Sequence, residues 1–339
     1  MGENNNGNIR NKKIYQAIVI AIVLIVIILG IGLYSKFINE NIETETTEYS
    51  NLDIDEDLLN IFYLNVGQAD STFITINGYN MLIDSGNDSD GYYIAEFLKA
   101  QNVNKIDYFI LTHYDEDHIG GAYKILEEEE LEIGILYMPD VTSETDTYEK
   151  LLQTIEDNNI NSDTTLVASN DIIYNLGKAY WKVLSADNNS TDANDSSIVI
   201  ELYYGDTNFL FMGDATTNVE ENSNISWDEV DVLKVGHHGS KTSTSQNFLN
   251  RLNPKYAIIS VGYNRYNHPD SEVITRLQNL ESIIEIYRTD EDGTIWITSN
   301  RNEITPTLLD YNLDGTGRKQ SNIFERRLLA FFFCVNDMI

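Results

Sequence analysis

The feature that most constrains this chain is a run of histidines and aspartates, HYDEDH, which begins at His113. It directly follows a short, largely apolar stretch that is typical of a strand buried in a sheet. In an extended segment the side chains of His113 and Asp115 point to the same side of the chain. Asp117 and His118 lie further on, where the chain turns into a helix. One strand end thus offers two pairs of ligands to two neighbouring cations.

The residue types in this run indicate a divalent metal site. Imidazole suits zinc, manganese or iron, whereas carboxylate oxygens suit harder ions such as manganese or magnesium, so the mixed set does not fix which ion binds. The competing interpretation is a solvated acidic helix start, because Asp and Glu favour the first turn of a helix. Two histidines alternating with carboxylates over so short a distance favour the metal site.

Two later segments can complete the site, since one segment cannot surround a cation. Asp214 follows the apolar run FLFM and a glycine, which places it at the end of a buried strand. His237 and His238 stand between glycines after another apolar stretch. Adjacent side chains there point in opposite directions, so that one histidine can bind metal while the other faces substrate.

Between residues 59 and 300 strand-like and helix-like stretches alternate, which predicts an α/β domain. Strands are predicted at 60–66, 71–76, 80–84, 106–111, 132–138, 180–185, 197–204, 207–212, 230–235, 256–261, 283–287 and 294–298. Helices are predicted at 91–101, 145–157, 244–252 and 271–280. Residues 301–339 form a tail with basic residues and an apolar run, to which the sequence assigns no role.

An apolar segment near the N-terminus predicts a membrane anchor. Residues 14–34 carry no charge and no polar stripe, and a helix of about 20 such residues crosses roughly 30 Å of hydrocarbon. Basic residues precede the segment and acidic residues follow it. The positive-inside rule therefore places residues 1–13 in the cytoplasm and the rest outside a bacterial cell membrane. A cleaved signal peptide is the alternative, although its apolar region is usually shorter. The acidic residues 35–58 are predicted to form a linker.

The charge of the chain limits its partners. It contains 54 Asp and Glu against 22 Lys and Arg, a net charge of −32, and such a chain repels polyanions at long range. A nucleic-acid substrate therefore has to be held by metal ions and a few local cations. The candidates for these cations are Lys234, Lys241, Arg265 and Arg288. The single cysteine excludes a disulfide framework and a cysteine zinc cage.

The order strand–HxDxDH–strand–GD–strand–GHHGS resembles the metallo-β-lactamase superfamily. More narrowly, it is similar to the extracytoplasmic hydrolase domain of the competence protein ComEC and its single-domain relatives. Further motifs in the same order support the resemblance over residues 60–299, and they are LNVGQADS from Leu64, LIDSG from Leu82, NDSS from Asn194, FMGDA from Phe211, ISVG from Ile259, NHP from Asn267 and YRTDEDG from Tyr287.

The resemblance implies a four-layer αββα sandwich with two divalent ions, Zn²⁺ or Mn²⁺, at one edge. The implied ligands are His113 and Asp115 for one ion, Asp117, His118 and His238 for the other, and Asp214 as a bridge. Asp70 and Asp84 suit positions that hold metal-bound histidines in one tautomer. The implied catalytic residues are Asp117, His237 and His268, and the implied substrate contacts are Ser240 and Lys241.

The chain departs from many superfamily members at the first ion. Asp115 stands where a histidine is common, and residues 194–197 supply no later histidine. ComEC-like domains share both features. Outside the ligand set, Asn65 stands where the family usually has Asp, and Ala69 where it usually has Gly. A first site poorer in nitrogen favours a ComEC-like hydrolase over an enzyme that opens β-lactams.

The resemblance predicts a membrane-anchored, extracytoplasmic metallo-hydrolase that cleaves phosphodiesters, because similar proteins act on nucleic acids or on phosphocholine esters. DNA and a small or cell-wall phosphoester both stay open as substrates, and the acidic charge disfavours tight DNA binding. The alternative is a non-catalytic surface module for DNA uptake or wall binding with a vestigial metal site. No obligate protein partner is implied.

Overall fold

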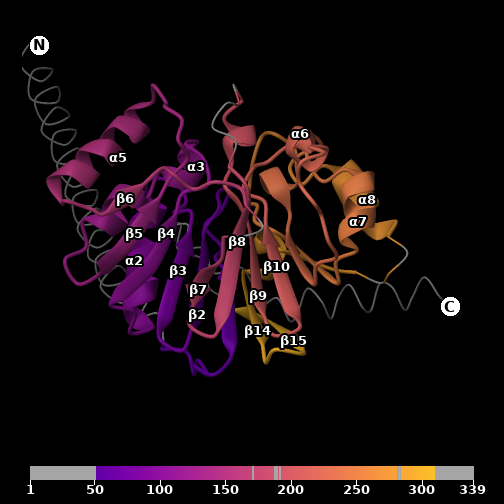
Figure 1. The fold of residues 1–339 in the computed structure, drawn as a ribbon, viewed down its shortest axis with the longest axis horizontal. Helices are drawn as coiled ribbons and strands as arrows, with labels where there is room; N and C mark the ends of the chain where they lie inside the picture. The colour runs from indigo at the N-terminus through magenta and orange to yellow at the C-terminus, as the bar shows by residue number, and fades with distance from the viewer. Residues whose placement is uncertain are drawn as a thin grey trace, which may run out of the picture. The chain divides into compact units, whose positions relative to one another are not determined.

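Two β-sheets packed face to face make up the middle of the fold (Figure 1). The computed structural model describes residues 51–309, apart from 170–171, 187–189, 191, 281 and 283. The predicted anchor, most of the predicted linker and residues 310–339 lie outside the described residues. Within the described part of the chain, no helix is both long and apolar enough to cross a membrane.

The first sheet is antiparallel in one half and parallel in the other. Strands β15 to β3 pair antiparallel, and β3 to β6 pair parallel. From edge to edge the described strands are β15 (Ile304–Leu309), β14 (Thr294–Ser299), β1 (Leu59–Tyr63), β2 (Thr72–Ile76), β3 (Tyr79–Ile83), β4 (Lys105–Ile110), β5 (Glu132–Tyr137) and β6 (Ser162–Asp163).

The second sheet repeats this division. Strands β10 to β13 pair parallel, and β7 to β10 pair antiparallel. The order is β13 (Glu285–Arg288), β12 (Tyr256–Ile259), β11 (Val232–Lys234), β10 (Thr207–Phe211), β9 (Val199–Tyr204), β8 (Ala179–Ser185) and β7 (Tyr174–Leu176). Neighbouring parallel strands end at the same edge, so each sheet collects the loops that follow its parallel strands at one edge.

The side chains of β10 show how one strand serves two layers. Phe209 and Phe211 enter the core between the sheets, whereas Leu210 joins the cluster on the opposite face. Tyr63 of β1 stacks on Phe211 with ring centroids 6.0 Å apart, which joins the two sheets. Burying side chains of this size contributes about 1.5–3 kcal/mol each, so the sheets hold together through this shared core.

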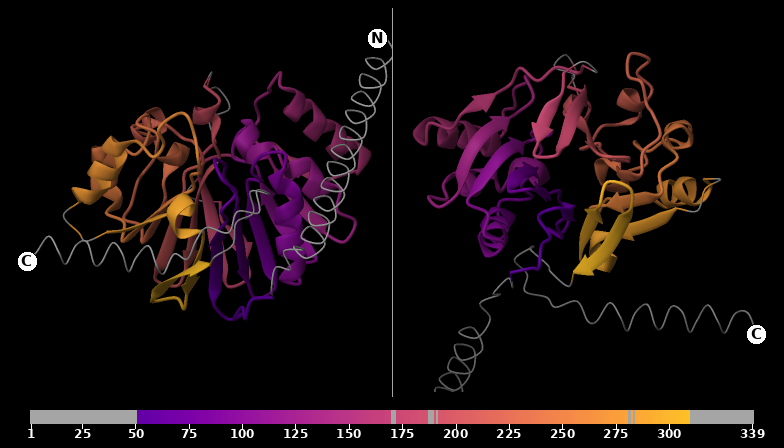
Figure 2. Two further views of the ribbon diagram at one scale, coloured as in Figure 1. Left: turned by 180° about the vertical axis from the view of Figure 1, so that it is seen from behind. Right: turned by 60° about the horizontal axis from the view of Figure 1, so that its bottom comes forward.

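Helices cover the outer faces of both sheets (Figure 1, Figure 2). Phe97 packs against Phe62 and Phe73 on the first sheet, with centroids 5.7 and 6.4 Å apart. Phe248 and Val273 join the apolar cluster on the outer face of the second sheet. The described helices are α2 (Asp90–Ala100), α3 (Glu116–Ile119), α4 (Ala122–Leu126), α5 (Asp146–Asp157), α6 (Thr217–Glu220), α7 (Gln246–Leu252), α8 (Ser271–Gln278) and α9 (Thr289–Asp292), with 3₁₀ turns η1 (Asn194–Ser196) and η2 (Gly236–Gly239). This arrangement confirms the predicted α/β fold with two sheets and flanking helices.

The predicted strands and helices are all present, with ends shifted by a few residues. Strands β6, β7 and β15 were not predicted from the sequence, and β15 lies past the predicted domain end at residue 300. β15 contains Pro306 and pairs only with β14, which suits an edge strand because proline cannot donate to a second neighbour. The first residues of the predicted tail therefore belong to the first sheet.

Candidate metal centre

Loops at the carboxyl ends of parallel strands bring the predicted site residues together. Asp84 follows β3 and His113 follows β4 in the first sheet, while Asp214 follows β10 and His238 follows β11 in the second. His268 lies in the loop after β12. In open α/β sheets this edge is where ligands bind, because the strand ends leave a crevice lined by loops.

The HYDEDH run turns from β4 into α3 at this edge. His113 and His118 are both fully buried, and their ring centroids lie 4.1 Å apart. Asp115 is the residue before α3, and half of its side chain is exposed, with Oδ2 lying 3.7 Å from His113 Nε2. The predicted pairing of these two residues on one side of the chain is thus present in the structure.

Asp214 is the centre of the cluster. Its Oδ1 lies 3.2 Å from His118 Nε2, and its Oδ2 lies 4.0 Å from His113 Nε2 and 3.7 Å from His238 Nε2. Asp117 reaches the same group from the other side, since its Oδ2 lies 3.2 Å from His238 Nε2. Five residues from two sheets therefore direct ligand atoms at one small volume.

The atoms that converge there make no hydrogen bond. His113 Nε2, His118 Nε2, His238 Nε2 and Asp214 Oδ1 are buried without a partner, whereas buried polar atoms in folded proteins are nearly always hydrogen-bonded. One group of four side chains, Asp70, His118, Asp214 and His238, places its ligand atoms within 4.8 Å of one another. Imidazole nitrogens and carboxylate oxygens at this spacing fit a divalent cation.

Hydrogen bonds on the far side of each ring fix which nitrogen faces the cluster. Asp84 Oδ2 lies 2.8 Å from His118 Nδ1, and the backbone oxygen of Ser260 lies 2.9 Å from His238 Nδ1. Both acceptors require a proton on Nδ1 and so leave the Nε2 lone pair for a metal. Asp84 is held in turn by the backbone N–H of Thr112, at 2.8 Å.

Asp70 lies differently from its predicted position behind a histidine. Within the described part of the chain Asp70 accepts no hydrogen bond from a histidine, and its Oδ2 instead accepts from Lys234 Nζ at 2.9 Å. Its Oδ1 is buried without a partner and belongs to the group of four possible ligands. Lys234, which the sequence suggested as a cation for substrate, is almost fully buried and committed to Asp70.

Negatively charged carboxylates surround the buried histidines. Burial by itself would lower the pKa of His118, but the carboxylates of Asp214 and Asp84 raise it well above the usual value. For His238, burial is likewise outweighed by Asp214 and Asp117, which raise the pKa to about 9. The potential that attracts a proton to these nitrogens also attracts a divalent cation.

The two carboxylates stay ionised in this environment. Burial favours the neutral acids, yet the charges of His238 and His118 hold the pKa of Asp214 well below its usual value. Burial also opposes ionisation of Asp117, but the close contact with His238 and the charge of His118 lower its pKa to about 2. Both side chains are therefore anionic over the physiological pH range.

His237 and His238 sit in an unusual backbone conformation. Their φ angles are 50° and 52°, in the left-handed region that residues other than glycine seldom adopt. His238 is buried, whereas the side chain of His237 is 22% exposed, with Nε2 lying 3.8 Å from Asp214 Oδ2. The Nδ1 of His237 contacts Thr242 Oγ1 at 3.1 Å. The strained turn thus directs one histidine inward and leaves the other accessible from outside.

The remaining predicted residues surround His237. The ring of His268 lies 5.6 Å from that of His237, and the Nδ1 of His268 is buried without a partner. Ser240 is buried and its hydroxyl contacts that of Thr242 at 3.0 Å, while Lys241 is exposed. The structure therefore brings His268 to the site edge and leaves Lys241 free to point outward.

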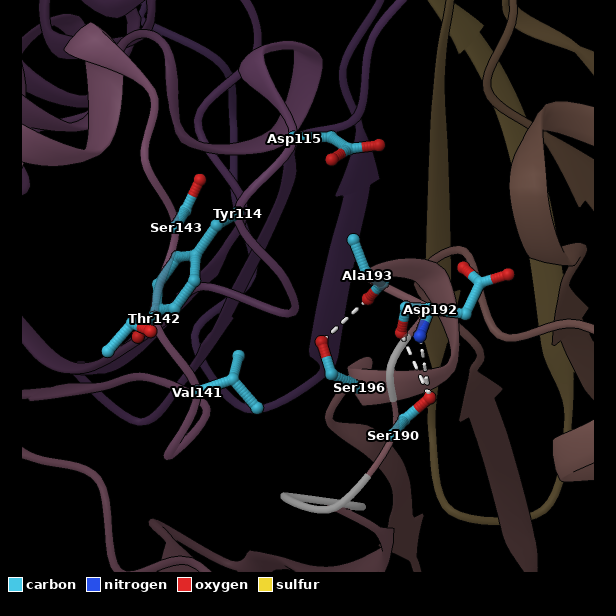
Figure 3. A pocket seen from close by; sticks show the side chains of 9 residues that line it. All are labelled: Tyr114, Asp115, Val141, Thr142, Ser143, Ser190, Asp192, Ala193 and Ser196. Carbon is cyan, nitrogen blue, oxygen red and sulfur yellow. Dashed lines mark hydrogen bonds between the residues drawn. The ribbon is translucent and has the colours of Figure 1, made fainter.

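A pocket of about 140 Å³ opens beside Asp115 (Figure 3). Figure 3 shows Tyr114 and Ser143 on one side of it and Asp192 and Ala193 on the other. Hydroxyl and carboxylate groups line it, and neither Lys nor Arg is among the lining residues, which are Tyr114, Asp115, Val141, Thr142, Ser143, Ser190, Asp192, Ala193 and Ser196. The pocket thus lies next to Asp115, one of the candidate metal ligands.

Comparison with known proteins adds to this geometry. Residues 64–160 and 191–263 match the sequence profile of the metallo-beta-lactamase superfamily. The chain is 32% identical over 254 residues to ComE operon protein 3 of Bacillus subtilis, which covers 68% of this chain and 32% of that protein. It is 33% identical over 229 residues to Recombination protein 2 of Haemophilus influenzae, and this alignment covers 66% of this chain and 27% of that protein. The chain spans about a third of the length of these curated relatives.

A solved structure has the same fold. The metallo-beta-lactamase fold protein YhfI from Bacillus subtilis aligns with a TM-score of 0.50 and 10% identity, over 72% of this chain and 100% of that one. At such low identity the likeness concerns the fold alone. Together the comparisons confirm the resemblance that the sequence motifs predicted.

Proposed function

The chain belongs to the metallo-β-lactamase superfamily, and from this premise we propose that it is a metal-dependent phosphodiesterase. One observation carries the proposal. Three histidine Nε2 atoms, those of His113, His118 and His238, converge with the carboxylate of Asp214, and the three nitrogens and Asp214 Oδ1 are buried without hydrogen-bond partners. A hydrolase of this family needs such a set to hold divalent ions.

In the proposed site, two ions, Zn²⁺ or Mn²⁺, are held at the edge shared by the two sheets. The proposed ligands are His113 and Asp115 for one ion, Asp117, His118 and His238 for the other, and Asp214 between them. Asp70 belongs to the same group of possible ligands and adds a further carboxylate. Divalent ions in such a site lower the pKa of water toward neutrality and neutralise charge on a phosphoryl group.

The side chains around the ions have separate tasks in this proposal. Asp117 is ionised, so it accepts a hydrogen bond from the attacking water and orients it. His237 is partly exposed, and burial lowers its pKa, so it is a neutral imidazole at pH 7 that contacts the phosphate or the leaving group. His268 lies beside His237, and Ser240 with Lys241 borders the substrate path.

The proposed location is the outer face of a bacterial cell membrane. Residues 14–34 act as a single anchor, residues 1–13 lie in the cytoplasm, and residues 35–58 link the anchor to the catalytic domain. The support for this topology is the uncharged apolar segment with basic residues before it and acidic residues after it. An engineered cysteine near residue 50 that reacts only from the cytoplasmic side would refute it.

The proposal is tested with the full chain in detergent. The protein is loaded with Mn²⁺ or Zn²⁺, its metal content is measured, and bis-p-nitrophenyl phosphate, p-nitrophenyl phosphorylcholine, single-stranded DNA and nitrocefin are supplied as substrates. Asp214→Asn is expected to lose both metal and turnover. Asp206→Asn is the matched control, because Asp206 is exposed and lies before β10, at the end of the strand remote from Asp214.

The outcomes separate the candidate functions. Metal-dependent hydrolysis of phosphodiesters that Asp117→Ala abolishes supports the proposal. An absence of metal uptake, or turnover that Asp117→Ala leaves unchanged, overturns the catalytic assignment. Tight metal binding without turnover of any of these substrates favours the non-catalytic surface module. Hydrolysis of p-nitrophenyl phosphorylcholine alone excludes the hypothesis that the protein is a nuclease.

A further inference from the structure

An exposed aromatic loop borders the metal centre. This segment, the tyrosine loop, runs from residue 262 to residue 269, after β12. Tyr263 is 96% exposed and Tyr266 is 73% exposed, more than any other large apolar side chain in the described part of the chain. Isolated exposed aromatic residues are common on protein surfaces, so the exposure alone indicates no function. The position of the loop beside the metal centre and its rigid conformation are what suggest a binding role.

One side chain fixes the shape of the tyrosine loop. The amide group of Asn264 donates to the backbone oxygens of Gly262 and His268, at 2.9 and 2.8 Å. Its Oδ1 accepts from the backbone N–H groups of Tyr266 and His268, both at 3.0 Å. These four bonds close the loop on itself. The tyrosines therefore stay on the outside without support from neighbouring elements.

Both ends of the loop are packed against the site. A Cβ on Gly262 would overlap the backbone of Gly67, and a Cβ on Gly239 would lie 2.7 Å from Pro269 Cβ. Gly262 also donates its N–H to Gln68 Oε1 at 3.2 Å. Since Gly239 directly follows His238, the loop is held at a set position relative to the metal ligands. A surface that is fixed before a ligand arrives loses little entropy on binding.

A continuous path of rings joins the loop to the ligands. The ring of Tyr266 stacks on that of His268, with centroids 5.6 Å apart and planes 30° apart. The ring of His268 meets that of His237 edge-on at 5.6 Å, and His237 Nε2 lies 3.8 Å from Asp214 Oδ2. A planar group on the outer face of Tyr266 would continue this stack outward from the reaction centre.

The tyrosine loop carries one exposed cation, Arg265. Of the four candidate cations, Lys234 is bound to Asp70, and Arg288 is paired with Asp290 and Glu291. Arg265 stands between the two tyrosines, is exposed and forms no ion pair within the described part of the chain. It complements a phosphate next to a stacked ring, and it repels a quaternary ammonium group that would otherwise suit a tyrosine face.

From these observations we propose that the tyrosine loop is a base-stacking subsite for single-stranded nucleic acid, with Tyr266 as the residue that stacks on a base and Arg265 as the contact to a flanking phosphate. The inference rests on the proposed phosphodiesterase function. Aromatic platforms with a nearby cation bind single strands with little sequence preference, because every base has a flat face. Tyr266 then selects nucleic acid over smaller phosphodiesters at the same metal centre.

The test measures binding in the absence of metal. The full chain in detergent is treated with EDTA, and an oligonucleotide carrying 2-aminopurine is titrated at moderate salt, which screens the net negative charge of the chain. Stacking quenches the fluorescence of that base. Tyr266→Ala is expected to weaken binding by about 5- to 100-fold and to remove the quenching. Tyr266→Phe keeps the ring face and is expected to bind like the unchanged protein. Tyr79→Ala is the matched control, since Tyr79 is 49% exposed at the start of β3, remote from Asp84 at its other end.

Two further probes make the result decisive. An abasic oligomer with the same phosphates is expected to bind more weakly than the intact strand and to be insensitive to Tyr266→Ala. Hydrolysis of bis-p-nitrophenyl phosphate by the metal-loaded protein is measured in parallel, and the control variant Tyr79→Ala, which lies outside the loop, is expected to leave its rate unchanged. A wild-type chain that fails to hydrolyse it would count against the proposed function, whereas the fluorescence titration tests the loop on its own.

Several results overturn the subsite. One is an equal affinity of Tyr266→Ala and the unchanged chain for the oligonucleotide. A second is loss of oligonucleotide binding in Tyr266→Phe, and a third is an equal affinity of the unchanged chain for intact and abasic strands. Displacement of the oligonucleotide by phosphocholine at comparable concentrations would show that the loop takes a quaternary ammonium group instead, which also contradicts the proposal.

Discussion

Lys234 Nζ lies 2.9 Å from Asp70 Oδ2, and both side chains are almost fully buried. Lys234 also donates to the backbone oxygen of Val235, at 3.2 Å. The pair stands beside the candidate metal ligands, and Asp70 belongs with His118, Asp214 and His238 to the group whose possible ligand atoms lie within 4.8 Å of one another. Lys234 therefore offsets part of the negative charge of the cluster and fixes the direction of the Asp70 carboxylate.

Removing the lysine is expected to destabilise the protein strongly. In Lys234→Met the buried Asp70 loses its partner, and breaking a buried pair in this way costs about 3–5 kcal/mol. Urea unfolding of the metal-free chain measures the change in the free energy of unfolding. Lys178→Met is the control, because the Lys178–Asp57 pair is exposed, with an N–O distance of 3.1 Å, and such a pair is worth about 0–1 kcal/mol.

The double variant Lys234→Met/Asp70→Leu separates stability from metal binding. It is expected to recover most of the stability, since apolar replacements for a buried pair are often neutral or better. Its metal affinity is expected to stay below that of the unchanged chain, because a carboxylate oxygen of the cluster is gone. Equal metal affinity in the double variant would show that Asp70 does not act on the metal.

Asp84→Asn is expected to lower metal affinity by about 10- to 100-fold, the usual effect of losing the partner behind a ligating histidine. Asparagine tolerates the positive φ of 59° at this position, so the backbone is preserved. Competition with a chelating dye measures the affinity. Asp195→Asn provides the comparison, because Asp195 is a buried carboxylate that accepts from Thr216 at 2.6 Å. A loss of the same size in Asp195→Asn would contradict a specific role for Asp84.

The metal-free protein is expected to lose stability as the pH rises from 6.5 towards about 9. The pKa of His238 is raised from 6.5 to about 9 in the folded chain, so folding is coupled to proton binding. The resulting stability is fully present below the unfolded value and disappears as the pH passes the folded value. The pKa of His118 is shifted in the same direction. Melting temperatures of EDTA-treated protein across this range test the expectation.

Bound metal is expected to remove this pH dependence, since a cation takes the place of the protons on the Nε2 atoms. The metal-loaded chain should therefore show a flatter profile between pH 6.5 and about 9 than the metal-free chain. A melting temperature of the metal-free protein that increases over the same range would contradict the raised pKa values.

Phe97→Ala is expected to destabilise the domain by about 3–5 kcal/mol. The ring of Phe97 is fully buried between α2 and the first sheet, in contact with Phe62 and Phe73, and its removal leaves a cavity there. Tyr92→Ala on the same helix is the control, because Tyr92 is 54% exposed and such surface changes stay within about 0.5 kcal/mol. Equal effects of the two variants in urea unfolding would mean that α2 is not packed as described.

Much of the fold follows from local patterns. The strand and helix positions were predictable because alternation of apolar residues reports which face of each element is buried. β15 escaped prediction because Pro306 interrupts a short strand whose inward residues, Ile304 and Leu308, are only partly buried, and pairing with β14 makes these residues a strand. β6 has two residues and β7 has three, too few for any period to show.

The sequence by itself determined the chemistry of the HYDEDH run, since His113 to His118 are neighbours and their spacing alone offers two pairs of ligands. Only the tertiary structure decided the partners from distant segments. Lys234 is 164 residues away from Asp70, and the pairing of β3 with β4 carries Asp84 to His118. Such contacts depend on how two sheets pack and where their strands end, and no local pattern records that.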